Sequence, residues 1–468
     1  MRRGHEIFSA AYSDPSDLHL DHVKEQTTYA NHQMHARNTW TSPFVKIPPE
    51  ILSKIFSHCS ETPTTICLPM IPGSYPWWLG QVCSGWREVL WSSPTTWNID
   101  VSKPKTKDPK IYLQETIHEI LSRTKGLISL RVDSYNSTHV SDLILSSSVR
   151  FVGLYLHTLP HSWFRTLLEL PIGALHSLKC LDVSLDWRRG PVHENFIGVH
   201  QGLPNLRELG IGGDTPIDLY LPYLPLSQLT SLSIKCVSVS TVELHLILRH
   251  CTSLLEADIW ITSIDHLDNQ PEGTILSTLK SFSVTVYAYM DWNSLLSPLT
   301  LPSLQTLHCV GCPSPTFPQA LTALFSRSKC SLLSLNIYPN ADSSEDGPQN
   351  SDLVLLLQET PKLTTLAIRY LVSPPLIHAV HGGLLPRLQE GNWTLKPGGL
   401  NSLFDLLDID LSQKFSGTLR ITCLGGEGFS AVQHRYCRNY RAYETAGVNI
   451  VVTNLIGYDL RDGEGQPS

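Results

Sequence analysis

The sequence lacks both the long apolar run and the excess of positive charge that would direct a protein to a membrane or to nucleic acid. Its longest apolar stretches, such as residues 352–358, are far shorter than the roughly 20 residues that a membrane-spanning helix needs. The 468 residues include 35 Lys and Arg against 42 Asp and Glu, which gives a formal net charge of -7. We therefore expect neither a membrane nor a nucleic acid as a partner.

A secretory signal and a disulfide framework are also missing. The first thirty residues contain several charged side chains and no apolar core segment, which is not the pattern of a signal peptide. The 11 cysteines have no regular spacing, so in a chain of this kind they are expected to be reduced thiols. The sequence therefore predicts an intracellular protein, cytoplasmic or nuclear.

No motif for enzymatic or metal chemistry is present either. Cys309 and Cys312 form the only Cys-x-x-Cys pair, whereas a structural zinc site needs four ligands, so Cys309 is interpreted as a core residue of a strand. The glycines of residues 424–430 lack the lysine of a phosphate-binding loop, and no Gly-x-Ser-x-Gly motif occurs. We expect no catalytic residue, metal or cofactor, and therefore no enzyme.

What the sequence contains in abundance is leucine at a repeated spacing. The pattern apolar-x-x-apolar-x-apolar begins at eleven positions: Leu127, Val149, Leu178, Leu206, Leu229, Leu254, Leu279, Leu304, Leu332, Leu363 and Leu388. Successive starts lie from 22 (127 to 149) to 31 (332 to 363) residues apart. The end of each copy predicts a short strand with alternating faces, and the residues between copies return to the next strand, often as a helix. One repeat cannot bury its apolar face alone, so the repeats must stack.

This pattern resembles the longer, helix-containing type of leucine-rich repeat over residues 111–424, with about eleven repeats. The resemblance implies an α/β fold, in which right-handed crossovers give a parallel sheet that lines an irregular, curved solenoid. Strands would then lie on the concave side, with helices and loops on the convex side.

Two apolar stripes precede the repeats. Ile47, Ile51 and Ile55 recur every four residues, with Leu52 and Phe56 beside them, which predicts an amphipathic helix. A second stripe with helical spacing runs over residues 79–90. A unit of about fifty residues cannot enclose so many large side chains, so some should face a partner or the first solenoid repeat.

These residues resemble an F-box, and the form of residues 76–97 is similar to the F-box-like class common in mushroom-forming fungi. The matching positions are Ile47, Pro48, Glu50, Ile51, Leu52, Ile55, Phe56, Val82, Cys83, Trp86, Arg87 and Trp97. The resemblance implies a small all-α module that binds the Skp-type adaptor of an SCF-type (cullin–RING) ubiquitin ligase, while the repeats select a target. By position, adaptor contact would come from Ile47, Pro48, Ile51, Leu52, Ile55, Val82 and Trp86, with packing inside the module as the alternative for each.

The predicted organisation therefore has five parts. Residues 1–42 form a flexible arm, residues 43–100 form the helical module with an inserted loop at 60–76, and residues 101–110 form a linker. The solenoid follows over 111–424, and residues 425–468 form a C-terminal cap and a mobile tail, with an apolar final strand within 447–456.

The strand residues that flank the buried apolar positions are predicted to bind a target protein on the concave face. They are Arg131, Tyr155, Asp182, Glu208, Lys235, Asp258, Trp260, Tyr287, Tyr338 and Arg369. The alternative function is a stand-alone protein-interaction module in which the F-box-like helices only cap the open end of the solenoid.

Overall fold

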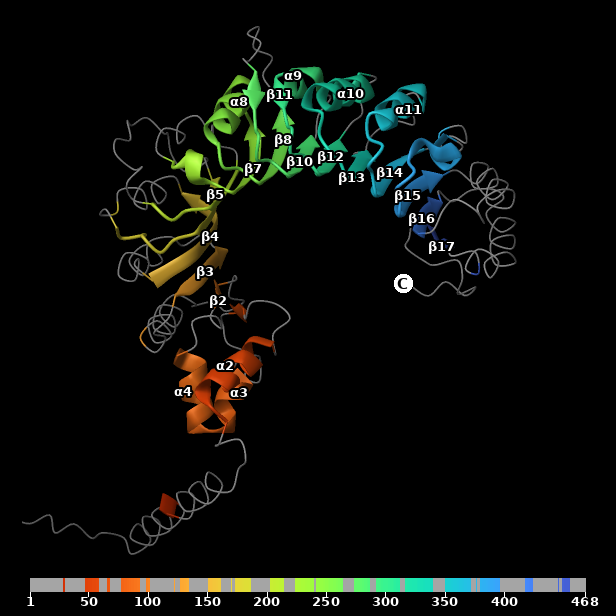
Figure 1. The fold of residues 1–468 in the computed structure, drawn as a ribbon. Coiled ribbons are helices and arrows are strands. Elements are labelled where there is room, and N and C mark those ends of the chain that lie inside the picture. The colour runs from red at the N-terminus through yellow and green to blue at the C-terminus, as the bar shows by residue number, and fades with distance from the viewer. Residues whose placement is uncertain are drawn as a thin grey trace, which may run out of the picture. The chain divides into compact units, whose positions relative to one another are not determined.

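Figure 1 shows the computed structural model of the chain. The structure describes residues 28–29, 47–58, 65–67, 77–92, 98–101, 122, 127–133, 150–160, 170, 173–186, 203–213, 224–239, 241–263, 273–286, 292–311, 316–339, 350–371, 376, 379–395, 417–423, 445 and 448–454. The chain divides into two compact units, residues 1–100 with 111–128 and residues 101–110 with 129–468. They are called the helical unit and the strand unit below. Within the described ranges, no helix is long and apolar enough to cross a membrane.

Among residues 47–101, the described part of the helical unit contains three helices and a pair of short strands. The helices are α2 (Pro49–His58), α3 (Trp77–Val82) and α4 (Ser84–Ser92), and the strands are β1 (Thr65–Cys67) and β2 (Asn98–Val101). Strands β1 and β2 pair in parallel. Since β1 lies within the predicted loop of residues 60–76, that insert includes a strand, as the β-branched Thr65 and Ile66 favour.

Helix α2 begins as its sequence favours. Pro49 occupies the first helical position, where the missing N–H costs nothing, and Glu50 in the first turn complements the helix dipole. The N–H groups of Ile51 and Leu52 donate to the carbonyl oxygen of Pro48 at 3.0 and 3.1 Å. The helix therefore starts immediately after Pro48.

The second apolar segment, predicted as one helix, forms two helices, because the helix is interrupted at Cys83. The Trp86 N–H donates to Cys83 Sγ at 3.4 Å, and the Arg87 N–H donates to the Cys83 carbonyl oxygen at 3.1 Å, so Cys83 caps the start of α4. Arg87 Nε also donates to the Gly80 carbonyl oxygen at 2.8 Å, which joins α4 to α3.

The strand unit is built on a 13-strand parallel sheet with several helices. Its strands are β3 (Ile128–Asp133), β4 (Phe151–Pro160), β5 (Cys180–Asp186), β6 (Glu208–Gly213), β7 (Ser231–Ser238), β8 (Glu256–Ser263), β10 (Ser281–Val286), β12 (Thr306–Gly311), β13 (Ser334–Pro339), β14 (Thr365–Leu371), β15 (Glu390–Leu395), β16 (Gly417–Cys423) and β17 (Val448–Asn454). Their spatial order follows the chain order. This is a repeat-like, solenoid-like α/β arrangement.

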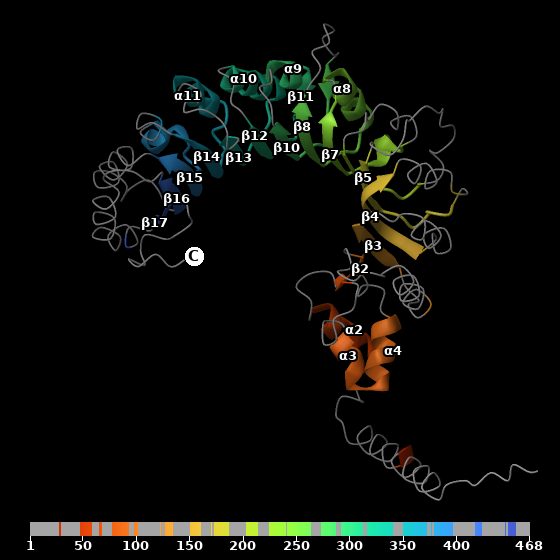
Figure 2. The same cartoon turned by 180° about the vertical axis from the view of Figure 1, so that it is seen from behind.

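Helices and short strands connect consecutive strands of this sheet. The helices are α8 (Thr241–His250), α9 (Trp292–Leu296), α10 (Phe317–Ser328) and α11 (Asn350–Gln358), with the short elements η7 (Leu226–Gln228) and η8 (Val380–Leu384). Strands β9 (Thr274–Ile275) and β11 (Leu299–Thr300) form a separate parallel pair. Figures 1 and 2 show α8 to α11 along the outer, convex side of the curved sheet and the strands along its inner, concave side.

Every repeat copy that the sequence predicts contains a strand, and nearly all are in the predicted register. From β5 to β15, each strand of the main sheet begins two residues after the first residue of its copy, as Cys180 follows Leu178 and Glu390 follows Leu388. The leucines at the start of these copies are buried. The leucine spacing therefore sets the positions of the strands.

The start of the second copy at Val149 is wrong by two residues. Leu154 pairs with Leu181, and Leu156 pairs with Val183, which makes fully buried Phe151 the first residue of the copy. The corrected spacings are 24 (127 to 151) and 27 (151 to 178) residues, in place of 22 and 29. The error arose because Leu154 satisfies the apolar pattern in both registers.

A proline-containing turn precedes several strands. The N–H of Leu206 donates to the Leu203 carbonyl oxygen across Pro204, and the N–H of Leu304 donates to that of Leu301 across Pro302. Proline suits the second position of such a turn because its φ angle is already set. The chain thereby turns from the convex side into the next strand.

The copy that begins at Leu388 has glycine at a position where most other copies have leucine. Gly391 pairs with Leu366 and Leu419, and a Cβ atom at Gly391 would lie 2.8 Å from Nε1 of the fully buried Trp393. We expect Gly391→Ala to lower the free energy of unfolding by about 1–3 kcal/mol through overpacking. Urea unfolding followed by circular dichroism measures this.

Gly212→Ala is the matched control, because a Cβ atom there would meet its nearest neighbours at an ordinary 3.6 Å. This substitution should change the free energy of unfolding by less than about 1 kcal/mol. Equal effects of the two substitutions would show that Trp393 does not fill the space above Gly391.

Candidate functional site

The first candidate site is the outer surface of α2. Its buried side consists of Leu52 and Phe56, and the Phe56 ring packs edge-on against Trp86 with ring centroids 5.2 Å apart. On the same helix, Ile51 is 46% exposed and Ile55 is 41% exposed. Because these two isoleucines are four residues apart, they lie one above the other on one face of the helix.

The structure separates the residues that were predicted to contact an adaptor. Ile51, Ile55, Pro48 and Val82 are exposed, and Ile47 is half-buried. Leu52 lies in the core, and Trp86 is half-buried against Phe56, so these two side chains stabilise the helical unit from within. We therefore define the α2 surface as Ile51 and Ile55.

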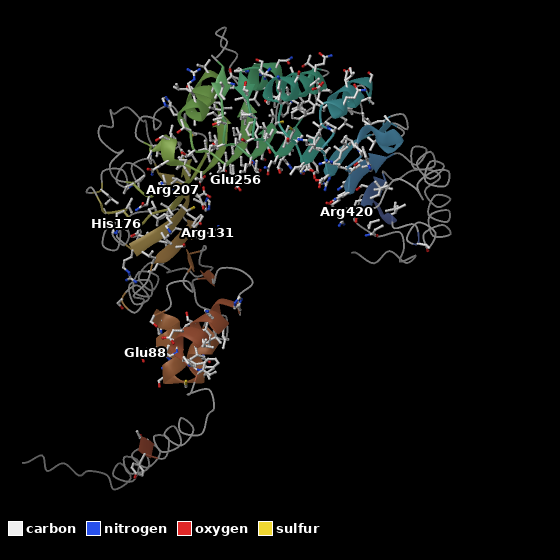
Figure 3. All side chains as sticks on the ribbon, in the orientation of Figure 1. Glu88, Arg131, His176, Arg207, Glu256 and Arg420 are labelled. Carbon is white, nitrogen blue, oxygen red and sulfur yellow. The ribbon has the colours of Figure 1, made fainter. Side chains whose placement is uncertain are left out.

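The second candidate site is the concave face of the strand unit. Along most strands, buried residues alternate with residues that face away from the core; in β7, Leu232 and Ile234 are buried and Lys235 is exposed. Figure 3 shows Arg131, Glu256 and Arg420 projecting from the strands on this side. The predicted target-binding residues that the structure describes all occupy such alternate positions, and Tyr287 lies outside the described residues.

One line of these positions crosses six strands and is called the aromatic row. Lys235, Trp260, Thr285, Val310 and Tyr338 lie on successive strands, and each is the register partner of the next. Arg369, on β14, contacts the ring of Tyr338. Its members are Lys235, Trp260, Thr285, Val310, Tyr338 and Arg369. The order is thus cation, aromatic, two smaller residues, aromatic, cation.

The first half of the aromatic row is a contact between Lys235 and Trp260. Lys235 Nζ lies 5.3 Å from the centroid of the Trp260 ring, within the range of a cation–π interaction. Trp260 Nε1 donates a hydrogen bond of 2.9 Å to Asp258 Oδ1, which fixes the orientation of the ring. Trp260 nevertheless remains 38% exposed.

The second half is centred on Tyr338. Arg369 Cζ lies 4.5 Å from the Tyr338 ring centroid, and the His308 ring stacks on Tyr338 with centroids 4.9 Å apart and planes inclined by 26°. Burial lowers the pKa of His308, Asp258 opposes this shift, and Arg369 adds to it. A neutral His308 beside Tyr338 leaves Arg369 as the cation of this group.

A separate group of interacting side chains, outside the aromatic row, lies on β3 to β5. Arg131 Cζ is 5.2 Å from the Tyr155 ring centroid. Burial, followed by a hydrogen bond with Cys180, raises the pKa of Tyr155, and burial raises the pKa of Cys180 to about 11. Both groups are therefore protonated near neutral pH, and the Cys180 thiol is not a reactive thiolate.

Sequence reasoning missed part of this face. Thr285 and Val310 were not predicted, although the same alternation places them in the aromatic row. At the far end, Arg420 Nε lies 3.7 Å from Glu390 Oε1, an exposed ion pair that the repeat pattern omitted because no copy was assigned to β16. Among the described residues, no group of three or more acidic, histidine or cysteine side chains could hold a metal ion.

Comparison with protein-family models finds no match, and comparison with curated proteins finds none either. The structure establishes the class of fold, a repeat-like parallel α/β sheet, together with a second compact unit that contains helices.

Proposed function

We propose that the protein is a substrate-recognition adaptor of an SCF-type cullin–RING ubiquitin ligase. In this proposal, the α2 surface binds the Skp-type adaptor, and the concave face of the strand unit binds a target protein. The F-box-like residues around Ile51 support the first assignment, and the exposed Lys235, Trp260 and Arg369 of the aromatic row support the second.

The observation that carries the proposal is the exposed isoleucine pair on α2. Helix α2 already buries Leu52 and Phe56, so Ile51 and Ile55 are additional apolar surface rather than an incomplete core. Apolar anchors four residues apart on a helix are typical of a helix that packs into a groove of another protein. Because each isoleucine is already more than half buried, covering its remaining exposed surface would contribute about 1 kcal/mol.

The proposed mechanism needs no chemistry in this chain. A protein that holds a ligase scaffold with one unit and a target with the other raises the local concentration of the target near the transferring subunits. Ubiquitin transfer would then be performed by those subunits, and this chain would determine which protein receives ubiquitin.

The double substitution Ile51→Glu with Ile55→Glu tests the proposal. We expect it to weaken co-purification with a co-expressed Skp-type adaptor by about a hundredfold or more, because two anchors are lost and two charges would have to be desolvated. Affinity is measured by biolayer interferometry on the purified full chain, and circular dichroism verifies that both proteins fold equally.

The matched control is Leu246→Glu on α8, since Leu246 is also 46% exposed on a helix surface but belongs to the strand unit. This variant should bind the adaptor as the unchanged protein does. If the folded double variant retains adaptor binding, or if the unchanged protein does not bind, the chain functions instead as a stand-alone protein-interaction module.

A further inference from the structure

The aromatic row has a charge distribution that selects its occupant. Lys235 and Arg369 stand at its two ends, and none of its six residues is acidic. The neighbouring Asp258 already accepts a hydrogen bond from Trp260, so one of its oxygens is in use. Each end of the row therefore offers a positive charge placed against an aromatic ring.

The two residues in the middle of the aromatic row are more buried than the residues at its ends. Thr285 is buried and Val310 is half-buried, whereas Trp260 on one side is exposed. Trp260 and Tyr338 lie three strand intervals apart, or about 14 Å at the usual spacing of neighbouring strands. Small and apolar residues of a ligand would fit over Thr285 and Val310, between the two rings.

The distance between the cations sets the length of the ligand. Lys235 on β7 and Arg369 on β14 are separated by five strand intervals, about 24 Å. An extended chain advances about 3.3 Å per residue, so about seven residue steps cover this distance. A single small anion could not reach both ends.

We infer that the aromatic row binds an extended protein segment that carries two carboxylate side chains about seven residues apart, with small or apolar residues between them. The carboxylates pair with Lys235 and Arg369, and the middle residues pack between Trp260 and Tyr338. This inference names the target class of the proposed adaptor, but the binding itself requires no ligase subunit.

Two carboxylates elsewhere on the concave face disfavour a nucleic acid as the occupant. Glu208 and Glu256 occupy the first outward position of β6 and β8, at the opposite ends of the strands from the aromatic row, and both are exposed. A continuous phosphate backbone would be repelled by these carboxylates, whereas two separate carboxylates on a peptide would not approach them. The net charge of -7 adds to this repulsion.

Three fluorescein-labelled peptides that differ only at their ends test the inference: EGSILSGE, QGSILSGQ and KGSILSGK. Fluorescence anisotropy with the purified full chain should show the acidic peptide binding at least about tenfold more tightly than the neutral one, and no binding of the basic one. Added salt should weaken the binding of the acidic peptide.

Substitutions in the chain locate the binding. Arg369→Glu and Lys235→Glu should each weaken the acidic peptide by about tenfold or more, since each reverses one of the two pairing charges. Lys280→Glu is the control, because Lys280 is exposed immediately before β10 and outside the aromatic row. It should retain binding within about twofold of the unchanged protein.

Undetectable binding of the acidic peptide, equal affinity for the acidic and basic peptides, or equal effects of Arg369→Glu and Lys280→Glu would each overturn the inference. None of these outcomes bears on the proposed binding of the adaptor by α2. Conversely, if the chain binds the acidic peptide but not the Skp-type adaptor, this inference is supported and the proposed ligase role is refuted.

Discussion

Phe56→Ala is expected to unfold the helical unit while the strand unit stays folded. The Phe56 ring is fully buried and packs edge-on against Trp86, so its removal deletes an aromatic contact between α2 and α4 and leaves a cavity. Truncation of a buried phenylalanine costs about 3–5 kcal/mol, which is much of the stability that so small a unit can have. Hydrogen exchange of peptides from residues 47–58 and 77–92 measures the loss of protection.

Two controls accompany this measurement. Ile51→Ala removes an exposed side chain of the same helix and should cost less than about 1 kcal/mol. Peptides from β10 to β14 should exchange at an unchanged rate, because they belong to the other compact unit. Unchanged protection of residues 47–58 in Phe56→Ala would contradict the core that is described for α2.

Comparison of Phe56→Ala with the double substitution Ile51→Glu and Ile55→Glu separates the core of the helical unit from the proposed α2 surface. Under the proposed function, Phe56→Ala should lose adaptor binding only together with the fold of the helical unit, whereas the double substitution should weaken it in a folded protein. A binding defect without unfolding is therefore the specific signature of the α2 surface.

Acid is expected to destabilise the strand unit through His245. This residue is buried in α8, and in the part of the chain that the structure describes neither ring nitrogen has a partner with good hydrogen-bond geometry. Burial lowers the pKa of His245 to about 4, the backbone of Leu295 and Ser294 opposes the shift, and Arg249 adds to it. The unfolded chain, with a histidine pKa near 6.5, therefore binds a proton at a pH where the folded chain does not.

The sign and the range of this effect follow from the two pKa values. The part of the unfolding free energy that depends on neutral His245 is fully present above pH 6.5. It is lost as the pH falls from 6.5 toward 4, because protonation then favours the unfolded state. The loss amounts to about 2 kcal/mol at pH 5 and about 3 kcal/mol at pH 4. Urea unfolding at pH 7.5 and pH 5, followed by circular dichroism, measures the difference.

His245→Leu isolates this contribution from all other titrating groups. It should remove about 2 kcal/mol of the difference between pH 7.5 and pH 5. It should also maintain or raise the stability at pH 7.5, since it removes two buried polar atoms that lack a partner with good hydrogen-bond geometry among the described residues. His250→Leu, an exposed change on the same helix, should leave the pH difference unaltered. An identical pH dependence in His245→Leu and the unchanged protein would refute the assignment.

The positions of the strands could be predicted because buried leucines recur in every copy. Leu178, Leu206 and Leu229 are all buried, and the strand of each begins two residues later. The pattern failed where several apolar residues competed, as at Phe151 and Leu154, and it did not include β16 or β1. The right-handed sense of the crossovers stays a prediction.

The helical unit shows why the spacing of apolar residues along one helix is insufficient to predict which of them are exposed. Ile51 and Leu52 are adjacent and equally apolar, yet one is exposed and the other is buried, because only the packing of α4 decides which side of α2 is covered. Similarly, the spacing over residues 79–90 does not reveal the break at Cys83, which depends on the cap that its thiol provides. The arm of residues 1–42 and most of the linker of residues 101–110 lie outside the described residues.

The candidate concave residues were predictable individually, but their association was not. Alternation along a strand predicts that Trp260 and Tyr338 face the same side. That they stand in one line, with Lys235 and Arg369 at its ends, depends on the register of six strands. Register between strands that are more than twenty residues apart is a property of the stacked fold.

The regular stacking of the strands fixes the distances between side chains on the concave face. Each repeat contributes one strand, so the gap between the two cations can change only in steps of about 4.8 Å. Loss or duplication of a repeat between β8 and β13 would shift the preferred carboxylate separation by one or two residues without altering either terminal cation. Ligand length could in this way diverge among descendants of the same gene while the chemistry of recognition is preserved.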